Sequence, residues 1–490
     1  MTKYQFYPLR FTRWNNNQIL LINDLGDWIV VSDDEFQQFV TKKLDINSPI
    51  GLDLQSKDFI TPQYSLFDLK RLANRYRTKK KYLFDSTALH MLVMTHRCNQ
   101  KCVYCQASSH QTYGSNLDME IETAKKCIDI AFESPSPYIK LEFQGGEPLL
   151  NKQVVFDAIL YAKNKNISEN KDLEFVICTN LITIDDDVLN FLENNKDVQI
   201  STSLDGPQEL HDTCRVYSSN RGTYFDFKQK LKALKKRLPS YQIAALTTIS
   251  KYNLHYMKDI VETYKNFSFD SIFLRPLNPF GFAKEKWDQL SYPIEEFIKE
   301  YESTLDYIIT LNKNGYFLRE EFACIFLSKI LTPFSNGFVD IQSPSGLGIA
   351  GAIYEINGDV FVSDEARMLF RSSGNKKFCL GNAVTQTRKE IYSNPILKRI
   401  LLDSTLEALP RCAWCVFQPY CGTDPIKNFV QFRSNISHKT YDDNCKLYTA
   451  IMNKLFKILL SADEEAKDIL YSWINSGKKL KYWSQENEAD

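Results

Sequence analysis

Residues 89–105 read LHMLVMTHRCNQKCVYC, and this stretch decides the fold. It begins with the apolar run Leu89–Thr95, which predicts a short buried strand. Three cysteines follow directly, with the spacing C-x3-C-x2-C. Residues that come directly after a strand of a parallel α/β barrel lie at its carboxyl rim, where such barrels build their active sites. The stretch therefore predicts a thiol-containing site at the end of the first strand of an α/β unit.

The three thiols are those of Cys98, Cys102 and Cys105. Three thiolates so close in sequence can bind three irons of a cubane iron–sulfur cluster and leave the fourth iron open to another ligand. The alternative is a structural zinc site, which would need His96 or His110 as its fourth ligand. Either way, this loop predicts metal-binding chemistry.

From residue 88 onward, apolar runs alternate with helical patterns. The predicted strands are Leu89–Thr95, Tyr138–Phe143, Leu173–Cys178, Val198–Leu204, Ile243–Ile249 and Ser271–Leu277. The predicted helices are Asp118–Ser134, Val154–Lys165, Val188–Asn195, Tyr224–Leu238, Leu254–Phe267 and, as the last of the unit, Ile294–Asn314. Strands that each return through a helix form a parallel sheet. Six such units are too few for a closed eight-fold barrel, so we predict an α/β fold with a partial (β/α)6 barrel.

The length of 490 residues suggests about three domains at ~150 residues each. We expect a small α+β domain with a connector at 1–85, the barrel at 86–315, a cysteine-rich domain at 316–447, and a C-terminal helix with an acidic tail at 448–490. A hydrophobic content of 43% and a charged content of 24% are typical of globular domains that bury a sizeable core.

The first domain begins with a hairpin pattern. Apolar segments at Gln18–Asn23 and Asp27–Ser32 flank a turn sequence. An acidic helix start then leads into a predicted helix over about Asp34–Lys43. The basic run Arg71–Lys81 predicts a solvated connector to the barrel.

Charge and hydropathy exclude several function classes. Lysine and arginine number 60, as do aspartate and glutamate, so the formal net charge is zero and no bulk field attracts nucleic acid or an anionic membrane. No apolar run approaches the ~18 residues of a membrane span, and the first residues lack a secretory pattern. We expect a cytoplasmic protein without nucleic-acid or membrane partners.

A second group of cysteines lies near the C-terminus, with the spacing C-x2-C-x5-C and a fourth cysteine 24 residues further on. Because the chain lacks an export signal, clustered thiols indicate metal ligands rather than disulfides. The isolated cysteines, which we interpret as small buried hydrophobic side chains, are Cys127, Cys178, Cys214, Cys324 and Cys379.

The first cysteine motif, with Tyr104 before its last cysteine, resembles the signature of radical S-adenosylmethionine (SAM) enzymes. Four further polar segments match that family in order, each at the end of a predicted strand. They are Gly145-Gly146-Glu147-Pro148, Thr179-Asn180, Ser201–Pro207 with His211 and Arg215 after it, and Arg275-Pro276-Leu277.

This resemblance implies that the open iron binds SAM, that one electron cleaves SAM, and that the resulting 5′-deoxyadenosyl radical abstracts hydrogen from a substrate. The glycine pair would permit close backbone approach, and Arg215 would bind the SAM carboxylate or else serve the structure. The residues that the resemblance assigns to SAM binding are Tyr104, Gly145, Gly146, Glu147, Asn180, Ser203, Asp205 and Arg215.

The second cysteine group resembles the SPASM region of radical SAM enzymes that modify peptides, which in full form holds two auxiliary clusters. The fourth cysteine of its central motif would fall at Pro425, and its G-x4-C segment becomes Gly358-x4-Ser363, so the ligands of the first auxiliary cluster are missing. The ligands of the second are all present, namely Cys412, Cys415, Cys421 and Cys445. We therefore expect two [4Fe–4S] clusters in total, with a four-thiolate zinc site as the alternative for the second.

Asp364 follows Ser363 in this region. In sulfatase-maturing relatives the aspartate at the matching place is proposed to take a proton during substrate oxidation, which makes Asp364 a candidate catalytic base. A helix cap or a solvated loop residue is the alternative interpretation.

Segments spread over residues 5 to about 450, including YPLRFTRWNNN, DSIFLRPLNPFGFA and CVFQPYCGTDP, resemble the HxsB maturases of the His-Xaa-Ser system. This resemblance implies a substrate with His-Xaa-Ser repeats, a second radical SAM protein of the HxsC type as partner, and an electron donor. The N-terminal hairpin and helix resemble winged-helix elements that bind leader peptides. Phe11, Trp14 and Trp28 are either aromatic anchors for the peptide or part of the hydrophobic core of this domain.

Three other functions remain as alternatives. A sulfatase-type maturase that makes formylglycine is disfavoured by the missing first auxiliary cluster. A noncatalytic metal-holding partner that presents a peptide is disfavoured by the intact three-cysteine motif. An RNA-modifying radical SAM enzyme would need a basic patch that the sequence lacks.

Overall fold

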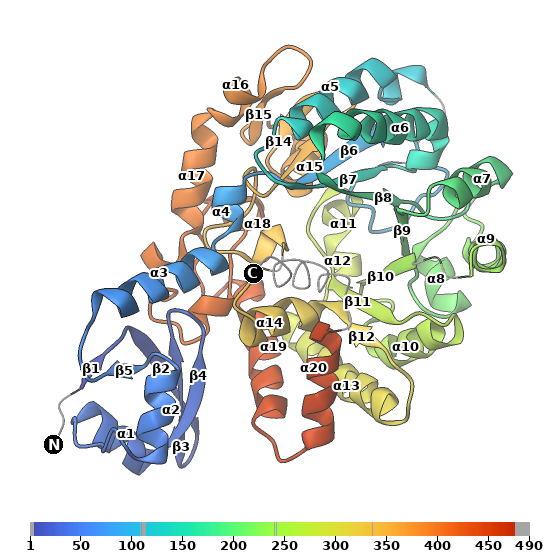
Figure 1. Ribbon diagram of the computed structural model, residues 1–490. Coiled ribbons are helices and arrows are strands. Elements are labelled where there is room, and N and C mark those ends of the chain that lie inside the picture. The colour runs from blue at the N-terminus through green and yellow to red at the C-terminus, as the bar shows by residue number, and fades with distance from the viewer. Residues whose placement is uncertain are drawn as a thin grey trace.

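The computed structural model describes residues 4–475 except 108, 110–113, 240, 242 and 336. Its centre is a ten-stranded sheet in which six neighbouring strands are parallel and follow chain order (Figure 1). These strands are β6 Leu89–Thr95, β7 Tyr138–Gly145, β8 Asp172–Cys178, β9 Val198–Ser203, β10 Ile243–Ile249 and β11 Ser271–Pro276. The predicted α/β fold with a partial six-stranded barrel is confirmed.

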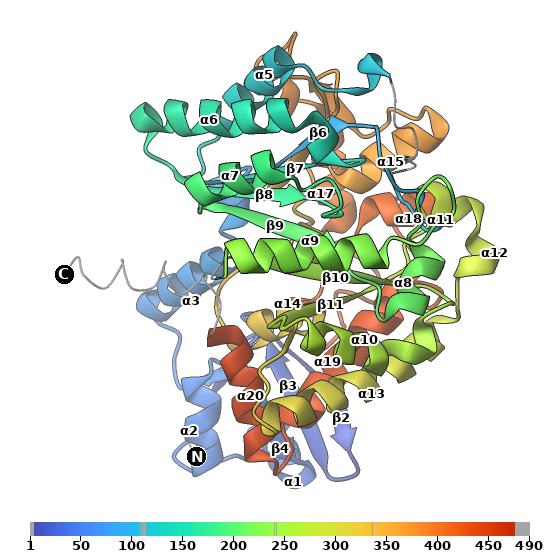
Figure 2. The same ribbon diagram turned by 90° about the vertical axis from the view of Figure 1, so that its right-hand side faces the viewer.

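Helices between the strands cover the outer face of the curved sheet (Figure 2). They are α5 Ile121–Phe132, α6 Lys152–Glu169, α7 Asp186–Asn194, α8 Gln208–Cys214, α9 Tyr224–Arg237 and α10 Met257–Asn266, with α11 Gly281–Glu285, α12 Trp287–Leu290 and α13 Ile294–Lys313 after β11. The apolar side chains of strands and helices meet in one continuous core. Within the described residues, no helix has both the length and the hydropathy that a membrane span requires.

The chain after α13 extends the same sheet at both ends. β12 Arg319–Glu320 pairs in parallel with β11, and β13 Gly351–Tyr354 pairs in parallel with β6. β14 Asp359–Phe361 and β15 Cys379–Asn382 continue beyond β13 as antiparallel strands. The helices of this part are α14 Glu321–Leu331, α15 Asp364–Ser373, α16 Arg388–Tyr392, α17 Pro395–Ser404, α18 Pro425–Phe432, α19 Asp443–Leu459 and α20 Glu464–Asn475. Residues 476–490, which include the expected acidic tail, lie outside the described residues.

The N-terminal unit is a three-stranded antiparallel sheet with two helices. The predicted hairpin is present as β3 Gln18–Asn23 and β4 Trp28–Ser32, and a strand that the sequence analysis missed, β2 Leu9–Asn15, pairs with β3. A capping box between Ser32 and Glu35 starts α1 Asp33–Val40, and α2 Pro49–Ser56 follows. The short strands β1 Gln5–Phe6 and β5 Ile60–Thr61 pair with each other.

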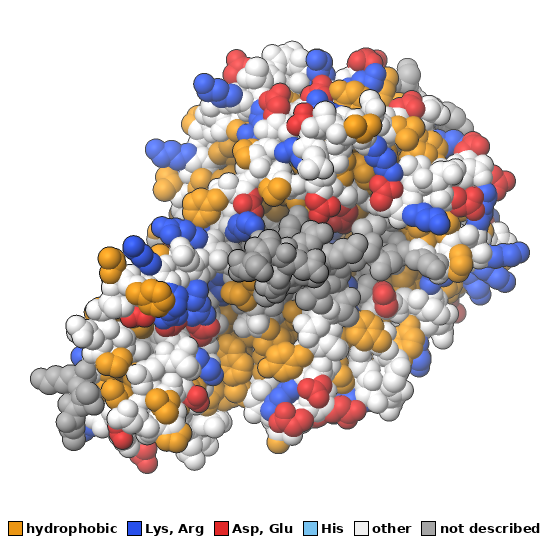
Figure 3. Space-filling view, in the orientation of Figure 1, with side chains coloured by type: hydrophobic (Ala, Val, Ile, Leu, Met, Phe, Trp, Pro, Cys, Tyr) orange, Lys and Arg blue, Asp and Glu red, His pale blue; other side chains and the backbone are white. Residues whose placement is uncertain are grey.

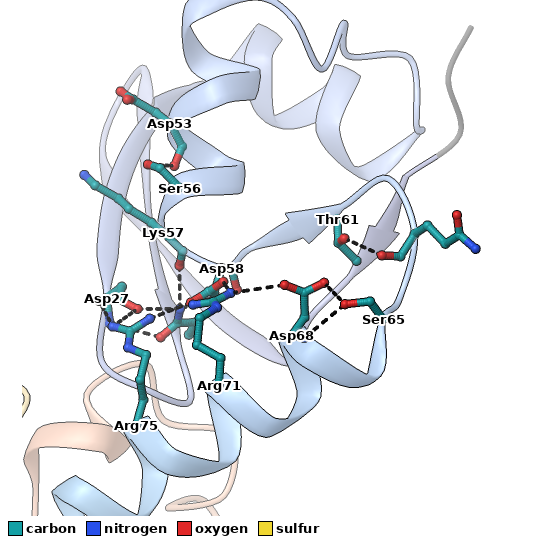
Figure 4. A network of polar contacts seen from close by, with 12 residues as sticks. Asp27, Asp53, Ser56, Lys57, Asp58, Thr61, Ser65, Asp68, Arg71 and Arg75 are labelled. Atoms are coloured by element: carbon teal, nitrogen blue, oxygen red, sulfur yellow. Dashed lines mark hydrogen bonds and ion pairs between the residues drawn. The ribbon is translucent and has the colours of Figure 1, made fainter.

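Most of the basic run expected to be a solvated connector lies in a helix, α3 Leu66–Lys79, in which no residue is fully buried; α4 Tyr82–Asp85 follows it. Arg71 and Arg75 both reach the buried carboxylate of Asp58, at 2.5 Å, and Arg75 also binds Asp27 at 2.7 Å (Figure 4). The sequence shows the cations of this helix but not their partners, which come from two other elements. These ion pairs fasten α3 to the N-terminal unit.

The N-terminal unit is itself packed onto the rest of the molecule. On one face of β3, Leu20 and Ile22 join the main core, while its other face belongs to a small core of its own. Trp14 and Trp28 pack edge-on against Phe456 of α19, with ring centroids 6.2 and 5.3 Å away. The N-terminal unit is thus continuous with the C-terminal helices.

A cavity of about 780 Å³ remains between the β3–β4 turn, α3 and the end of α14. In Figure 3, hydrophobic side chains line the surface between the N-terminal unit and the C-terminal helices. Exposed aromatic residues at this cavity include Phe67 and Phe334.

Candidate metal and cofactor site

The three-cysteine loop leaves the carboxyl end of β6 and is held by the last residue of α8 and the segment after it. The backbone amide of Lys101 donates to the carbonyl of Val216 at 2.7 Å, and that of Val103 donates to Cys214 at 2.9 Å. Along the loop, Cys98 is buried, whereas Cys102 and Cys105 are partly exposed. The loop therefore presents its thiols from a fixed backbone.

The thiols lie close enough to affect one another's ionisation. Burial raises the pKa of Cys98, and the neighbouring thiols of Cys102 and Cys105 raise it further. Burial also raises the pKa of Cys102 to about 11, which the guanidinium of Arg215 partly opposes. These are groups that ionise readily only when a cation such as iron binds them.

The donor set of this loop fits an iron–sulfur cluster better than zinc. Among the described residues, no three His, Cys, Asp or Glu side chains are spaced to hold a single ion. A cubane cluster places each thiolate on a different iron, so its thiols need not converge on one point. His96, one candidate fourth zinc ligand, is bound to Glu355 at 2.6 Å, and the other, His110, lies outside the described residues.

Tyr104, Asp205 and Arg215 form a buried clamp behind the cysteine loop. The Tyr104 hydroxyl donates to Asp205, and Arg215 donates to the Tyr104 oxygen and to Gln100, each at 3.0 Å. Burial raises the pKa of both Tyr104 and Asp205, and Arg215 opposes the shift. The structure thus places these residues in contact with one another and with the loop, so they position the thiols; a direct contact with SAM stays a prediction.

The glycine pair at the end of β7 allows the backbone to approach the start of the cysteine loop. Gly145 has a φ of +139°, and a Cβ on it would collide with the carbonyl of Thr95. A Cβ on Gly146 would likewise collide with the carbonyl of Arg97. The amides of Gly146 and Glu147 donate to those same two carbonyls, each at 2.8 Å. The two glycines are therefore needed for close packing of the end of β7 against the backbone of Thr95 and Arg97, whether or not a cofactor also lies there.

The Glu147 carboxylate is fully buried and ties β7 to the end of β8. It accepts from the amide of Leu149 at 3.1 Å, the hydroxyl of Thr179 at 2.8 Å and the amide of Asn180 at 2.8 Å. Three protein donors give this carboxylate a structural function. Binding of SAM by Glu147 stays a prediction.

Asn180 continues this connection to the loop, because its side-chain amide donates to Asn99 at 2.7 Å. Ser203, the last residue of β9, is partly exposed at the same edge. Seven of the eight residues assigned to SAM from the sequence therefore lie at the carboxyl edge of the sheet or in the cysteine loop. The eighth, Arg215, is the C-cap of α8 and contacts that loop.

Polar side chains that the sequence analysis missed line the interior face of the barrel. Along β7, Lys140, Glu142 and Gln144 are partly exposed and alternate with buried apolar residues. The Cys178 thiol, on β8, donates to Glu142 at 3.3 Å, and Lys140 pairs with Glu174 at 3.1 Å. The alternation in YIKLEFQG is the signal that could have revealed this polar face.

The prediction that the isolated cysteines are buried is correct for Cys127 and Cys214. It is wrong for three that are partly exposed, namely Cys178, Cys324 and Cys379.

Asp364 is the first residue of α15 and ends a buried polar chain that starts at the base of the cysteine loop. Its carboxylate accepts from Arg367 at 2.7 Å, Arg367 also contacts Glu355 at 3.4 Å, and Glu355 binds His96. Burial raises the pKa of Asp364, which Arg367 opposes. Asp364 also raises the pKa of Glu142 and Cys178, in addition to their burial, so it faces the barrel interior.

The structure brings the four C-terminal cysteines together. Burial raises the pKa of Cys412 to about 11 and that of Cys421 to about 12, and the thiols of Cys415 and Cys445 contribute to both shifts. Cys445 lies in the first turn of α19. Arg10 of the N-terminal unit donates to the carbonyl of Ala413 at 2.8 Å, within the loop between the first two cysteines. Ligation of a cluster by this group stays a prediction.

Two positions where the SPASM pattern expects cysteines that this chain lacks, Ser363 and Pro425, are at helix starts. The Ser363 hydroxyl caps α15 by accepting from the amide of Ala366 at 3.2 Å. Pro425 is the first residue of α18, directly after its N-cap Asp424. Neither residue can supply a thiolate ligand.

Comparison with known proteins agrees with this geometry. Residues 92–264 match the Radical SAM superfamily, so the chain contains a radical SAM domain and the protein is a radical SAM enzyme. The cofactors of this superfamily, SAM and an iron–sulfur cluster, are those expected from the sequence.

Two relatives illustrate the range of the similarity. The uncharacterized protein MJ0907 of Methanocaldococcus jannaschii is 29% identical over 272 residues, which cover 54% of this chain and 89% of the relative. The cysteine-type anaerobic sulfatase-maturating enzyme of Clostridium novyi is 25% identical over 344 residues, which cover 68% of this chain and 85% of that enzyme.

Solved structures share the fold. The enzyme anSMEcpe with bound AdoMet and the Cp18Cys peptide superimposes with a TM-score of 0.62 at 21% identity, covering 78% of this chain and 99% of that one. Streptococcus suis SuiB bound to the precursor peptide SuiA gives a TM-score of 0.54 at 14% identity, covering 91% of this chain and 100% of that one. The fold is thus shared with both over most of this chain.

The clamp predicts how the first cluster responds to loss of one hydroxyl. Tyr104→Phe leaves Asp205 and Arg215 buried without their shared partner, so the cysteine loop should release iron to a chelator about 10–100-fold faster. The measurement is made in a Cys412→Ala background, where the auxiliary cluster is removed. Tyr82→Phe, which deletes a hydroxyl bound to Pro344 far from the loop, is the control. Equal release rates for the two variants would show that the clamp does not position the thiols.

Proposed function

We propose that this enzyme modifies a residue of a ribosomally made peptide or protein with His-Xaa-Ser repeats. The observation that carries the proposal is the polar barrel interior, lined by Glu142, Cys178 and Asp364, beside a three-cysteine loop in a radical SAM domain. Structural relatives solved with the Cp18Cys peptide and with SuiA support a peptide as the substrate class.

The His-Xaa-Ser repeat is the finer part of the proposal. It rests on the resemblance of segments throughout the chain to HxsB maturases, among them YPLRFTRWNNN and CVFQPYCGTDP. The same resemblance supports a second radical SAM protein of the HxsC type as a partner and a separate electron donor.

When bound, SAM at its reduced cluster supplies a 5′-deoxyadenosyl radical that abstracts hydrogen. The protein's own residues bind and orient the peptide and exclude water. Asp364 is positioned to take a proton from the substrate, because Arg367 holds one of its carboxylate oxygens and burial raises its pKa. The barrel interior orients the substrate through its alternating polar side chains.

A sulfatase-type maturase is the second candidate, because the Clostridium novyi relative carries that name. Ser363 and Pro425 argue against it, since they cap and start helices where ligands of another auxiliary cluster would be needed. We therefore place the His-Xaa-Ser substrate first.

The N-terminal unit is the proposed recognition element for the peptide. Within the described residues β2 pairs only with β3, so its outer edge can add a strand. Phe11 on β2 is 57% exposed and lies against Phe36, with ring centroids 4.9 Å apart. Trp14 and Trp28 instead pack on Phe456, so Phe11 is the aromatic anchor that remains.

The function is tested with the anaerobically reconstituted holoenzyme, SAM, dithionite and a synthetic peptide of four His-Ala-Ser repeats. We expect a mass change in the peptide together with formation of 5′-deoxyadenosine. A parallel reaction contains a peptide with a sulfatase maturation motif. Formylglycine in that peptide, with no change in the repeat peptide, would contradict the proposal.

The recognition element is tested by Phe11→Ala rather than by truncation, because deletion would also remove the Arg10 contact to the Cys412–Cys415 loop. Peptide affinity should fall about tenfold, which corresponds to ~1.4 kcal/mol, while peptide-free SAM cleavage should be unchanged. Phe225→Ala, at a residue on α9 with 62% exposure, is the control. Normal peptide affinity in Phe11→Ala would make this unit a structural cap only.

A further inference from the structure

Acidic and basic side chains from four elements meet beside Asp364. Asp340 lies in the turn Val339–Ile341, Glu365 in the first turn of α15, and Asp424 at the N-cap of α18. The cations are Lys427 of α18 and Arg275 at the end of β11. Three contacts bring these residues together: Gly422 lies against Ile341 and Gln342, α15 packs against α18, and Arg275 lies 3.9 Å from Glu365. The charges of Glu365, Asp424, Lys427 and Arg275 all act on Asp340.

Asp424 has one carboxylate oxygen without a partner. Its Oδ1 accepts from the amides of Ile426 at 2.7 Å and Lys427 at 3.2 Å, as an N-cap should. Its Oδ2 is buried and finds no hydrogen-bond donor among the described residues, although the residue as a whole is only 5% exposed. Buried carboxylate oxygens normally have donors, so this atom indicates a ligand that brings one.

Another aspartate N-cap, Asp442, has hydrogen-bond donors on both of its carboxylate oxygens. Asp442, the N-cap of α19, also receives two backbone amides on one oxygen. Its other oxygen accepts from Ser437 at 2.5 Å and from Lys439 at 2.9 Å. Capping therefore does not by itself leave a carboxylate oxygen unpartnered.

The charges of the group are unbalanced. Three carboxylates face two cations, and the only ion pair within the group at 4 Å or less in the described residues joins Arg275 to Glu365 at 3.9 Å. Burial and then the charge of Glu365 raise the pKa of Asp340 to about 7, with Lys427 opposing. Burial raises the pKa of Asp424 to about 6, again against Lys427. An added positive charge would relieve this repulsion.

The group borders the barrel interior. Glu365 adjoins Asp364 in the chain, and Arg275 acts on the pKa of Asp364, which in turn acts on Glu142 and Cys178. Asp340 and Arg275 are partly exposed, and Arg275 lies near the carboxyl end of β11, at the same edge of the sheet as the cysteine loop. A peptide in the barrel interior could therefore reach the group with a side chain.

We propose that Asp340, Glu365 and Asp424 form a subsite that binds a cationic side chain of the substrate peptide. This inference rests on the proposed peptide-modifying function. The described residues include no three side chains spaced to hold a metal ion, so an organic cation is the favoured occupant. An ammonium, guanidinium or imidazolium group brings both the charge that balances the group and the N–H donor that Asp424 Oδ2 lacks.

Three synthetic peptides test the subsite on the SAM-bound holoenzyme. They are four-repeat peptides of His-Ala-Ser, Lys-Ala-Ser and Gln-Ala-Ser, and their dissociation constants are measured by titration calorimetry. We expect the lysine peptide, which carries permanent cations, to bind about tenfold more tightly than the glutamine peptide, and the histidine peptide to lie between them or equal the lysine peptide. Equal affinities for the lysine and glutamine peptides would overturn the proposal.

The variants Asp340→Asn, Glu365→Gln and Asp424→Asn then assign the preference to the group. Asparagine is as good an N-cap as aspartate, so Asp424→Asn preserves the start of α18. Each variant should remove most of the tenfold preference for lysine over glutamine while leaving the affinity for the glutamine peptide unchanged. Asp185→Asn, an N-cap of α7 remote from the subsite, is the matched control and should keep the preference. Variants that retain the preference would overturn the proposal.

Failure of the proposed cation subsite can be distinguished from failure of the proposed peptide-modifying function. If the wild-type enzyme modifies the repeat peptide without a preference for cations, only the subsite is wrong. If it binds and modifies none of the three peptides, the proposed substrate class is wrong and the subsite with it.

Discussion

The rest of the site depends on the close backbone contact between the end of β7 and the start of the cysteine loop. The amides of Gly146 and Glu147 bind the carbonyls of Thr95 and Arg97, and two glycines are needed because side chains there would collide with those carbonyls. This contact sets where Cys98 begins its loop. Glu147 then ties the same point to the segment after β8, and the Tyr104 clamp ties the loop to the segment after β9. The thiols are positioned by the whole carboxyl edge of the sheet.

The three regions of the chain form one connected structure around this edge. β13 pairs directly with β6, so the cysteine-rich region is an extension of the barrel sheet. The N-terminal unit reaches the second cysteine group through Arg10 and packs on α19 through two tryptophans. A peptide held by the N-terminal unit would therefore be held by a surface with direct contacts to the loop between Cys412 and Cys415.

Apolar runs made the barrel predictable from the sequence. β6 and β10 have the bounds that their mainly apolar runs predict. Every residue of β6 after Leu89 is buried, as expected for a parallel strand covered on both faces. β2 was missed because it alternates charged and aromatic residues at an exposed edge. The ion pairs of Arg71 and Arg75 in α3 with Asp58 were not predicted, because the partners lie in different segments and a sequence pattern does not show such pairing.

The sequence predicted which residues form the candidate site but not which of them contact one another. The motif residues do gather at one edge, yet Tyr104, Asp205 and Arg215 bind one another. Sequence spacing shows which side chains share an edge and cannot show which of them are already satisfied by protein partners. For the same reason, the unpartnered oxygen of Asp424 is visible only in the structure.

The central claim is that the first cysteine group alone cleaves SAM and the second holds a separate cluster. It is tested most directly by measuring iron and 5′-deoxyadenosine together in the reconstituted wild type, Cys98→Ala and Cys412→Ala. We predict about eight irons per wild-type chain and about four in each variant. Reductive SAM cleavage should be abolished in Cys98→Ala and retained, uncoupled from peptide modification, in Cys412→Ala. Formation of 5′-deoxyadenosine by Cys98→Ala, or zinc in place of iron, would contradict the claim.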